Sequence, residues 1–249
     1  MPPHVPTKRL LHIPFAYIQA FTFSIPFVSL FTVVSLGVYL HLDKVTTTHC
    51  KVPNIVPSIS AVIGGVTPER YIWRFGMAFF SFPQLLNSFL YYNFFGQSSA
   101  ASEKWYRTLN KLVWLLFVVQ NLSLFGLTYV SSVEYFPFHR NCFILFVVCS
   151  MLHMILFLTI FYYGRPSTYR DNISFRLRLA FAASHISIFL ISLYFYWRHN
   201  TYCEPYVYSI YGFCEYLVVL TNVAFQTVQA VDFQNDYHLT IEVARPHKP

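Results

Sequence analysis

Six stretches of mostly apolar residues, each about as long as a bilayer is thick, limit how this chain can fold. A helix rises about 1.5 Å per residue, so roughly 20 residues cross a hydrocarbon layer of about 30 Å. Windows of that length give spans at about 17–40, 71–95, 111–131, 141–163, 177–197 and 207–229. Only 11% of the residues are charged and 55% are hydrophobic, which excludes an ordinary soluble domain. The sequence predicts an all-α integral membrane protein, a six-transmembrane-helix bundle forming a single membrane domain over residues 1–249.

The second and sixth spans are the least apolar. Pro83 interrupts the second span, and Glu215, Asn222 and Gln226 dilute the sixth. Proline is tolerated in a membrane helix when neighbouring groups satisfy the carbonyl that it leaves free. Both segments are therefore kept as spans.

The basic residues predict an orientation. With six spans, both termini and the loops 96–110 and 164–176 share one side, and this side, counted with Lys111 and Arg178 at the adjoining span ends, holds 11 of the 17 lysine and arginine residues. Because cytosolic segments carry the excess of Lys and Arg, we expect the N- and C-termini in the cytosol. Residues 41–70 then form a large luminal loop, and 230–249 form a cytosolic tail whose charges, from Asp232 onward, are expected to be solvated. The net charge of +7 fits this topology and contact with anionic lipid, without a nucleic-acid partner.

Two of the five cysteines, Cys50 and Cys203, fall in loops on the luminal side. If that side is the lumen of the secretory pathway it is oxidising, and a Cys50–Cys203 disulfide would join the long first loop to the turn before the last span. Cys142, at the luminal start of the fourth span, competes for either partner. Cys149 and Cys214 are expected to act as small apolar side chains within the bilayer.

Polar side chains recur near the middle of the spans. Asn121, His153, His185 and Glu215 lie close to the centres of the third to sixth spans, and Asn222 follows Glu215 on the same helical face. Since lipid offers no hydrogen-bond partner, we expect a buried polar layer inside the bundle. Two interpretations stay open, namely hydrogen bonds that hold the helices together and a role in lipid headgroup binding or proton transfer. No metal site is predicted, because the histidines lack a third ligand.

A second polar group is expected at the luminal rim. Its members are His49, Glu69, Arg70, Arg74, Glu134, His139, Arg140, Arg198, His199 and Glu204. A histidine beside a carboxylate can perform general acid–base chemistry on an ester or hydroxyl. Arg70 and Arg74 are four residues apart, so they project from one helical face, and guanidinium groups suit phosphate oxygens. Ordinary ion pairing at the membrane interface explains the same residues.

Motifs typical of soluble hydrolases are absent from the sequence. It contains no GxSxG, HExxH, Walker or paired CxxC motif, so a serine hydrolase or zinc protease has no support. An HxxxxD acyltransferase signature is also missing.

Long blocks of the chain resemble the post-GPI-attachment-to-proteins factor 2 family, within the wider Frag/DRAM/Sfk-type group of six-span membrane proteins. The blocks are TTTHCKVPNIVPSISAVIGGVTPERYIWRF at 46–75, QNLSLFGLTYVSSVEYFPFHRN at 120–141, HM at 153–154 and RHNTYCEPYVYSIYGFCEYLVVLTNVAFQ at 198–226. The resemblance implies a multi-pass Golgi or endoplasmic reticulum protein that helps remodel the lipid of glycosylphosphatidylinositol (GPI) anchors. Its members are needed when a lyso-GPI intermediate is reacylated, and they are suspected of being the acyltransferase.

The resemblance also implies the partners. These are GPI-anchored proteins with their lyso-GPI lipid, membrane phospholipid and other remodelling enzymes, with an acyl donor such as acyl-CoA or phospholipid and no cofactor. Two positions depart from the family pattern, which commonly has Glu where this chain has Gln120 and His where it has Gln226. Both changes remove a titratable group.

The leading hypothesis is an enzyme that reacylates a lyso-GPI lipid at the luminal leaflet, as GPI-anchored proteins mature toward the cell surface. His199, oriented by Glu204, is the expected acid–base residue, with His49 second. The substrate-binding residues are expected to be Arg70, Arg74 and Arg198.

Two other functions stay open. One is a non-enzymatic accessory factor that presents lipid or recruits the true acyltransferase, which the missing acyltransferase signature favours. The other is a proton or ion pathway through Glu215, His153 and His185.

Overall fold

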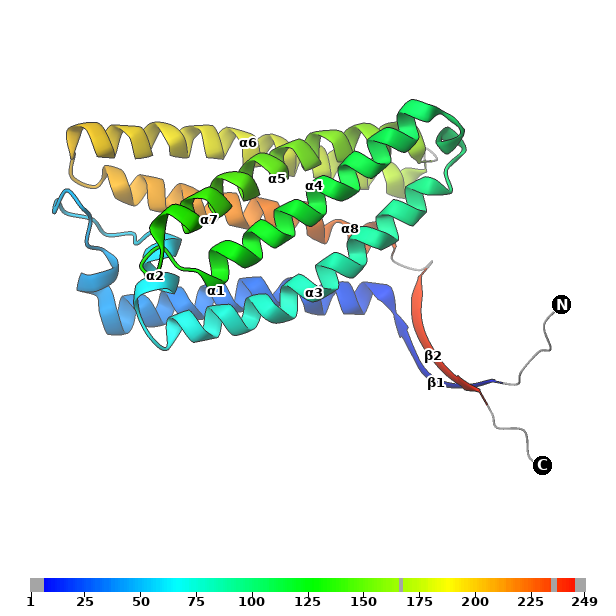
Figure 1. The fold of residues 1–249 in the computed structure, drawn as a ribbon, viewed down its shortest axis with the longest axis horizontal. Helices are drawn as coiled ribbons and strands as arrows, with labels where there is room; N and C mark the ends of the chain where they lie inside the picture. Colours follow the sequence, from blue (N-terminus) through cyan, green and yellow to red (C-terminus); the bar gives the residue numbers. More distant parts are fainter. Residues whose placement is uncertain (1–6, 166–167, 234–236, 245–249) are drawn as a thin grey trace.

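The computed structural model describes residues 7–165, 168–233 and 237–244. Its elements are β1 (Thr7–Pro14), α1 (Phe15–Val45), α2 (Ile59–Gly65), α3 (Glu69–Gly96), the 3-10 turn η1 (Ser99–Ser102), α4 (Lys104–Tyr129), α5 (Phe136–Gly164), α6 (Tyr169–Tyr202), α7 (Val207–Thr227), α8 (Gln229–Asp232) and β2 (His238–Ala244). The long helices run side by side along one axis (Figure 1). Each packs on the next in chain order, and α7 and α8 return to α1, which closes the bundle.

Different segments of the chain form the two ends of the bundle. The proximal end carries β1 and β2, and the distal end is formed by the connections 46–68, 130–135 and 203–206 (Figure 1). The short helix α2 lies within the first of these connections and contacts α1, α3 and α7.

Among the described residues, five helical segments are long and apolar enough to cross a membrane. They are Phe15–Val45, Lys104–Tyr129, Phe136–Gly164, Tyr169–Tyr202 and Val207–Asp232. Helix α3 is 28 residues long but is not among them. Its polar residues, such as Gln84 and Asn87, are buried inside the bundle, where Asn87 and Gln19 exchange hydrogen bonds between α3 and α1. The protein is thus a helical multi-pass membrane protein.

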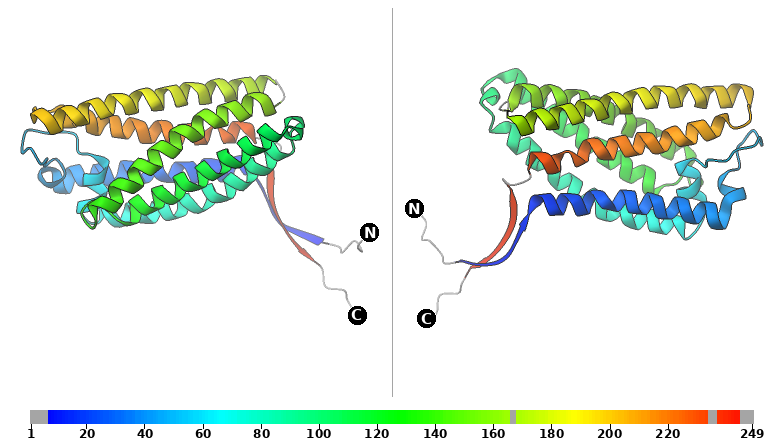
Figure 2. Two further views of the ribbon diagram at one scale, coloured as in Figure 1. Left: turned by 45° about the horizontal axis from the view of Figure 1, so that its top comes forward. Right: turned by 180° about the vertical axis from the view of Figure 1, so that it is seen from behind.

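The two ends of the chain form a small antiparallel sheet, which the all-α prediction missed. Strand β1 pairs with β2 so that Leu11 lies opposite Ile241 and Ile13 opposite Leu239. The two-stranded ribbon projects away from the helices (Figure 2). The pairing joins residues more than 220 positions apart, so no local pattern in the sequence indicates it.

A buried ion cluster fixes the proximal end of α6 to α8. The carboxylate of Asp232 lies 2.6 Å from Arg178 and 3.1 Å from Arg165, and Arg165 also lies 2.8 Å from Asp171. Asp232 is 1% exposed, so the expectation that its charge is solvated is wrong. Aromatic rings also surround the guanidinium group of Arg178. The nearest is Phe157, whose ring centroid lies 4.4 Å from the guanidinium carbon. The tail from Asp232 therefore begins inside the fold.

Candidate functional site

A disulfide between Cys50 and Cys203 organises the distal end. The two sulfurs are bonded and the Cα atoms are 5.4 Å apart, across a sequence separation of 153 residues. The predicted pairing is confirmed, and the competing Cys142 is a free cysteine. The bridge holds the first connection against the end of α6, and it brings the neighbours of both cysteines together.

Two histidines predicted as catalytic meet beside this disulfide. The rings of His49 and His199 are edge to face, with centroids 5.0 Å apart, and Tyr208 packs on His199 at 4.7 Å. His199 is fully buried, and in the described part of the chain neither of its ring nitrogens has a hydrogen-bond partner. Buried polar groups are almost always bonded, so this imidazole is free to receive another group.

The same cluster resembles part of a metal site, because one ligand atom each from His49, Cys50 and His199 lies within 4.8 Å of the others. The Cys50 sulfur is used in the disulfide, however, and a metal is bound by thiolate. Two imidazoles remain, fewer than the three or four protein ligands typical of zinc. These residues do not fit a metal centre in this state.

Glu204 reaches the ring of His199 through its main chain and not through the carboxylate that the sequence predicted. Its carboxylate instead accepts two hydrogen bonds from Arg198, at 2.5 Å and 2.9 Å. Consecutive helical residues point about 100° apart, so His199 faces the bundle while Arg198 faces outward toward the turn. The hydrogen bonds from Arg198 hold the pKa of Glu204 below its ordinary value. The guanidinium of Arg198 is occupied by this pair.

Arg70 and Arg74 share one carboxylate. Arg74 lies 2.5 Å from Glu134 and Arg70 lies 3.8 Å from it. Hydrogen bonding with the Ser131 N–H, and to a smaller extent with the Ser131 side chain and Arg74, lowers the pKa of the Glu134 carboxyl. Arg70 also donates to the main-chain carbonyl of Gly64 in α2. Two guanidinium groups face one carboxylate, so the cluster keeps a net positive charge at the distal end.

Sequence reasoning missed a serine beside one of the rim histidines. The Oγ of Ser60 lies 3.5 Å from Nε2 of His139, and Nδ1 of the same ring lies 2.9 Å from the main-chain oxygen of Val130. His139 is 6% exposed and Ser60 is half-buried. The two residues are 79 positions apart without a shared motif, so only the packing of α2 against the 130–135 connection reveals the pair.

Glu215 fixes the helix that carries Ser60. Its carboxylate accepts hydrogen bonds from the Ile59 N–H at 3.1 Å and the Tyr211 hydroxyl at 2.7 Å. The first connection also crosses α7 closely at Gly212, where an added Cβ would meet two main-chain oxygens at 3.0 Å and 3.1 Å. The carboxylate inside the sixth predicted span therefore anchors α2 to α7.

Three of the other four residues of the expected polar layer have hydrogen-bond partners in the described part of the chain. Asn121 donates to the Phe117 oxygen of its own helix at 2.8 Å. His185 contacts the Val218 oxygen at 3.1 Å, and Asn222 donates to Ser150 across α7 and α5 at 2.5 Å. The contacts of His185 and Asn222 each join two helices and fit the interpretation of hydrogen bonds that hold helices together, whereas the Asn121 bond stays within its own helix.

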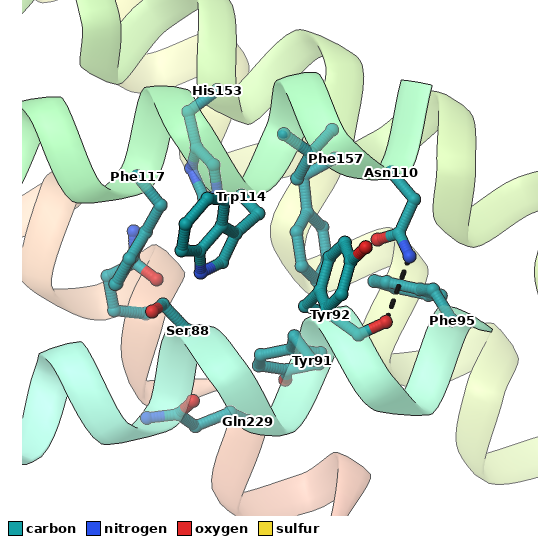
Figure 3. Close-up of a pocket in the computed structure, with 12 residues that line it drawn as sticks. Ser88, Tyr91, Tyr92, Phe95, Asn110, Trp114, Phe117, His153, Phe157 and Gln229 are labelled. Carbon is teal, nitrogen blue, oxygen red and sulfur yellow. Dashed lines mark hydrogen bonds between the residues drawn. The ribbon is translucent and has the colours of Figure 1, made fainter. Parts of the chain in front are cut away.

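His153 borders a small cavity in the proximal half of the bundle (Figure 3). The cavity of about 20 Å³ has room for one water molecule. His153 Nδ1, Trp114 Nε1 and Gln226 Nε2 line it without a hydrogen-bond partner in the described residues. One water could satisfy these three atoms. A larger ligand does not fit.

Residues 14–236 match the family model described as Frag1/DRAM/Sfk1/Cwh43P N-terminal domain. A Caenorhabditis elegans protein named "Post-GPI attachment to proteins factor 2" is 36% identical over 229 residues, covering 90% of this chain and 87% of that protein. The Danio rerio and Xenopus tropicalis proteins named "Acyltransferase PGAP2" are 38% and 32% identical, covering 79% and 92% of this chain and 85% and 91% of those proteins. No solved structure matches the chain.

Proposed function

Because the chain belongs to the post-GPI attachment to proteins factor 2 family, we propose that it transfers an acyl chain to a lyso form of the GPI anchor lipid. The observation that carries this proposal is the match along 92% of the chain to a relative named an acyltransferase. The substrates are then the lipid of GPI-anchored proteins and an acyl donor such as acyl-CoA or phospholipid. The expected location is the Golgi membrane, with the endoplasmic reticulum as the alternative.

The proposal includes six crossings, with α3 as the sixth and the distal end facing the lumen. The pairing of β1 with β2 supports it, because two paired ends lie on one side of a membrane and the number of crossings is then even. The excess of Lys and Arg in the proximal segments favours cytosolic termini. A luminal distal end also suits a disulfide.

The charge at the distal end supports binding of the inositol phosphate by Arg70 and Arg74. Glu134 neutralises one of the two guanidinium groups and leaves one positive charge for an anion. Main-chain carbonyls fix both groups, so little side-chain freedom remains to be lost on binding. Arg198 stays a weaker substrate-binding candidate because Glu204 occupies it.

His199, with His49 beside it, stays the proposed acid–base residue named from the sequence, now without the Glu204 carboxylate as its orienting group. Its two unpartnered ring nitrogens support contact with a hydroxyl of the acceptor. The test is turnover of purified protein in lipid nanodiscs, supplied with a lyso-GPI lipid and a labelled acyl donor.

Wild-type protein is expected to form diacyl product, and His199→Ala is expected to lose most of this activity. His12→Ala is the matched control, because His12 lies in β1 at the opposite end of the bundle. If His199→Ala turns over at the wild-type rate, the acid–base assignment of His199 is wrong and the proposed acyl transfer stands. Folding of both variants is followed by the Cys50–Cys203 disulfide in non-reducing peptide mapping.

A second function, lipid presentation without catalysis, is favoured by an apolar groove between α1 and α3. The groove has a volume of about 610 Å³, and its lining includes Phe21, Ile25, Tyr71, Phe75 and Phe79. Such a groove could hold the acyl chain of a lipid for another enzyme. No turnover by the purified wild-type protein, with full rescue of surface GPI-anchored protein in cells lacking the gene, would select this function.

A further inference from the structure

We propose that Ser60 is a nucleophile that carries the acyl group as a covalent ester, with His139 as its general base. The inference rests on the acyl transfer proposed above and adds a reaction route to it. Both residues lie at the distal end, Ser60 in α2 and His139 in the first turn of α5, and Arg70 of α3 donates to the last residue but one of α2. No sequence motif marks the pair.

The hydrogen bonds of His139 fix which ring nitrogen can act as a base. Nδ1 lies 2.9 Å from the main-chain oxygen of Val130, which can only accept a hydrogen bond, so Nδ1 carries the proton. Neutral Nε2 then has a free lone pair, and it faces the Ser60 hydroxyl at 3.5 Å. This distance is longer than in an aligned catalytic pair, but such contacts are often loose before substrate binds. Ser60 as nucleophile, His139 as base and the Val130 carbonyl as orienting group form the arrangement that nucleophilic catalysis uses.

The helix that carries Ser60 is fixed at its start and near its end. The Ile59 N–H donates to Glu215 on α7, and the Ser58 hydroxyl accepts from the Ala61 N–H at 3.3 Å. Gly64 faces the 130–135 connection so closely that a Cβ there would touch Ser131 and Ser132 at 3.4 Å. These contacts hold Ser60 against His139, as a catalytic pair requires.

The proposed phosphate-binding residues border the same pair. Arg70 donates to the Gly64 carbonyl at the end of α2, four residues after Ser60. Arg74 donates to the Tyr129 carbonyl at 2.8 Å, next to the Val130 carbonyl that orients His139. A lipid phosphate bound by these guanidinium groups would bring its glycerol hydroxyl to the side of the bundle that carries Ser60.

The covalent route balances without a cofactor. In the first step the Ser60 oxygen bonds to the carbonyl carbon of an acyl ester or thioester, His139 takes the hydroxyl proton, and the leaving alcohol or thiol departs with that proton. In the second step a hydroxyl of the lyso-lipid gives its proton to His139 as its oxygen bonds to the acyl carbon. The bond to Ser60 breaks, and its oxygen takes the proton back. In this route His139 takes the acid–base role in both steps, and His199 contacts only the acceptor hydroxyl in the second step.

The test separates loading from transfer. Purified full-length protein in nanodiscs receives a phospholipid or an acyl-CoA with an alkyne-tagged saturated chain, and no acceptor. Wild-type protein is expected to gain one alkali-labile tag on the peptide containing Ser60, read by mass spectrometry. Ser60→Ala should lose it. His139→Gln should slow loading by about 10²–10⁴-fold, the usual contribution of a general base.

Three further variants control for folding and for chemistry. Ser102→Ala removes an exposed hydroxyl from η1, at the proximal end of the bundle, and should load at the wild-type rate. Ser60→Cys should form a thioester that neutral hydroxylamine cleaves, whereas the wild-type ester resists it. His199→Ala should keep loading, because its proposed role concerns the acceptor. An intact Cys50–Cys203 disulfide reports that each variant is folded.

The outcomes distinguish the covalent route from the proposed function. If wild-type and Ser60→Ala proteins transfer acyl chains to the lyso-lipid equally well, the covalent route is wrong and the acyl transfer stands. If Ser60 is loaded but the acyl chain is not transferred to the lyso-GPI lipid, the assignment of Ser60 as nucleophile stands and the proposed acceptor is wrong. A tag on any other residue overturns the assignment of Ser60, and a wild-type protein that neither loads nor turns over overturns both proposals.

Discussion

Replacing Asp232 by asparagine should destabilise the bundle strongly. The carboxylate lies 2.6 Å from Arg178 and 3.1 Å from Arg165, and it accepts hydrogen bonds from Ser174 and Tyr91 at 2.5 Å each. Asparagine keeps the shape but removes the charge that compensates two buried guanidinium groups. Removing one partner of a buried pair costs about 3–5 kcal/mol, and we expect a loss near the lower limit because the amide oxygen still accepts.

A compensating double variant tests this reasoning. Asp232→Leu with Arg178→Met removes the central pair together, and the methionine can still pack against Phe157 and its aromatic neighbours. Arg165 keeps Asp171 at 2.8 Å, so no bare charge remains. Replacing both members of a buried pair by apolar residues is often neutral or stabilising. The double variant should therefore be more stable than Asp232→Asn.

The measurement is reversible unfolding in mixed micelles. The tryptophan fluorescence of the protein, with its disulfide intact, is recorded as the fraction of denaturing detergent increases. Leu10→Ser in the exposed ribbon is the control and should unfold like the wild type. The reasoning fails if Asp232→Asn lies within about 1 kcal/mol of the wild type, the range of an exposed ion pair. It also fails if the double variant is the less stable of the two.

Three further predictions concern the distal end. Gly212→Ala places a Cβ 3.0 Å from a main-chain oxygen and should cost about 1–3 kcal/mol in the same unfolding assay, whereas Gly65→Ala, with its nearest neighbour at 3.8 Å, should be tolerated. Cys203→Ser should cost about 2–4 kcal/mol and abolish the effect of reducing agent on the unfolding midpoint. Because Arg198 lowers the pKa of Glu204, this pair should stabilise the fold above the unfolded pKa of about 4.3 and lose that contribution as the pH falls through the folded value; Glu204→Gln should remove this part of the pH dependence.

Features that depend on local sequence were predictable. Apolar length located the five helical segments that meet the membrane criterion, and loop position paired Cys50 with Cys203. Features that depend on which helical face turns inward were harder to predict. Arg198 and His199 are adjacent, yet one reaches Glu204 and the other reaches His49.

Contacts between distant segments were beyond the sequence patterns. Asp232 looked like the start of a polar tail because its partner Arg178 lies 54 positions earlier on another helix. Ser60 lies in a stretch of small and apolar residues, and its partner His139 follows 79 positions later. Neither pair has a periodicity or spacing that a single sequence displays.

The disulfide and the β1–β2 ribbon both set an order for biosynthesis. Cys50 leaves the ribosome 153 residues before Cys203, and β1 before almost every other element. The disulfide must therefore wait until α6 has been made, and the ribbon until the segment after α8 has been made, so the nascent chain carries an unpaired thiol and an unpaired strand during most of its synthesis. A chain truncated after α6 would lack β2 altogether. Its missing strand and exposed Cys50 thiol would give a quality-control system two separate signs that the chain is incomplete.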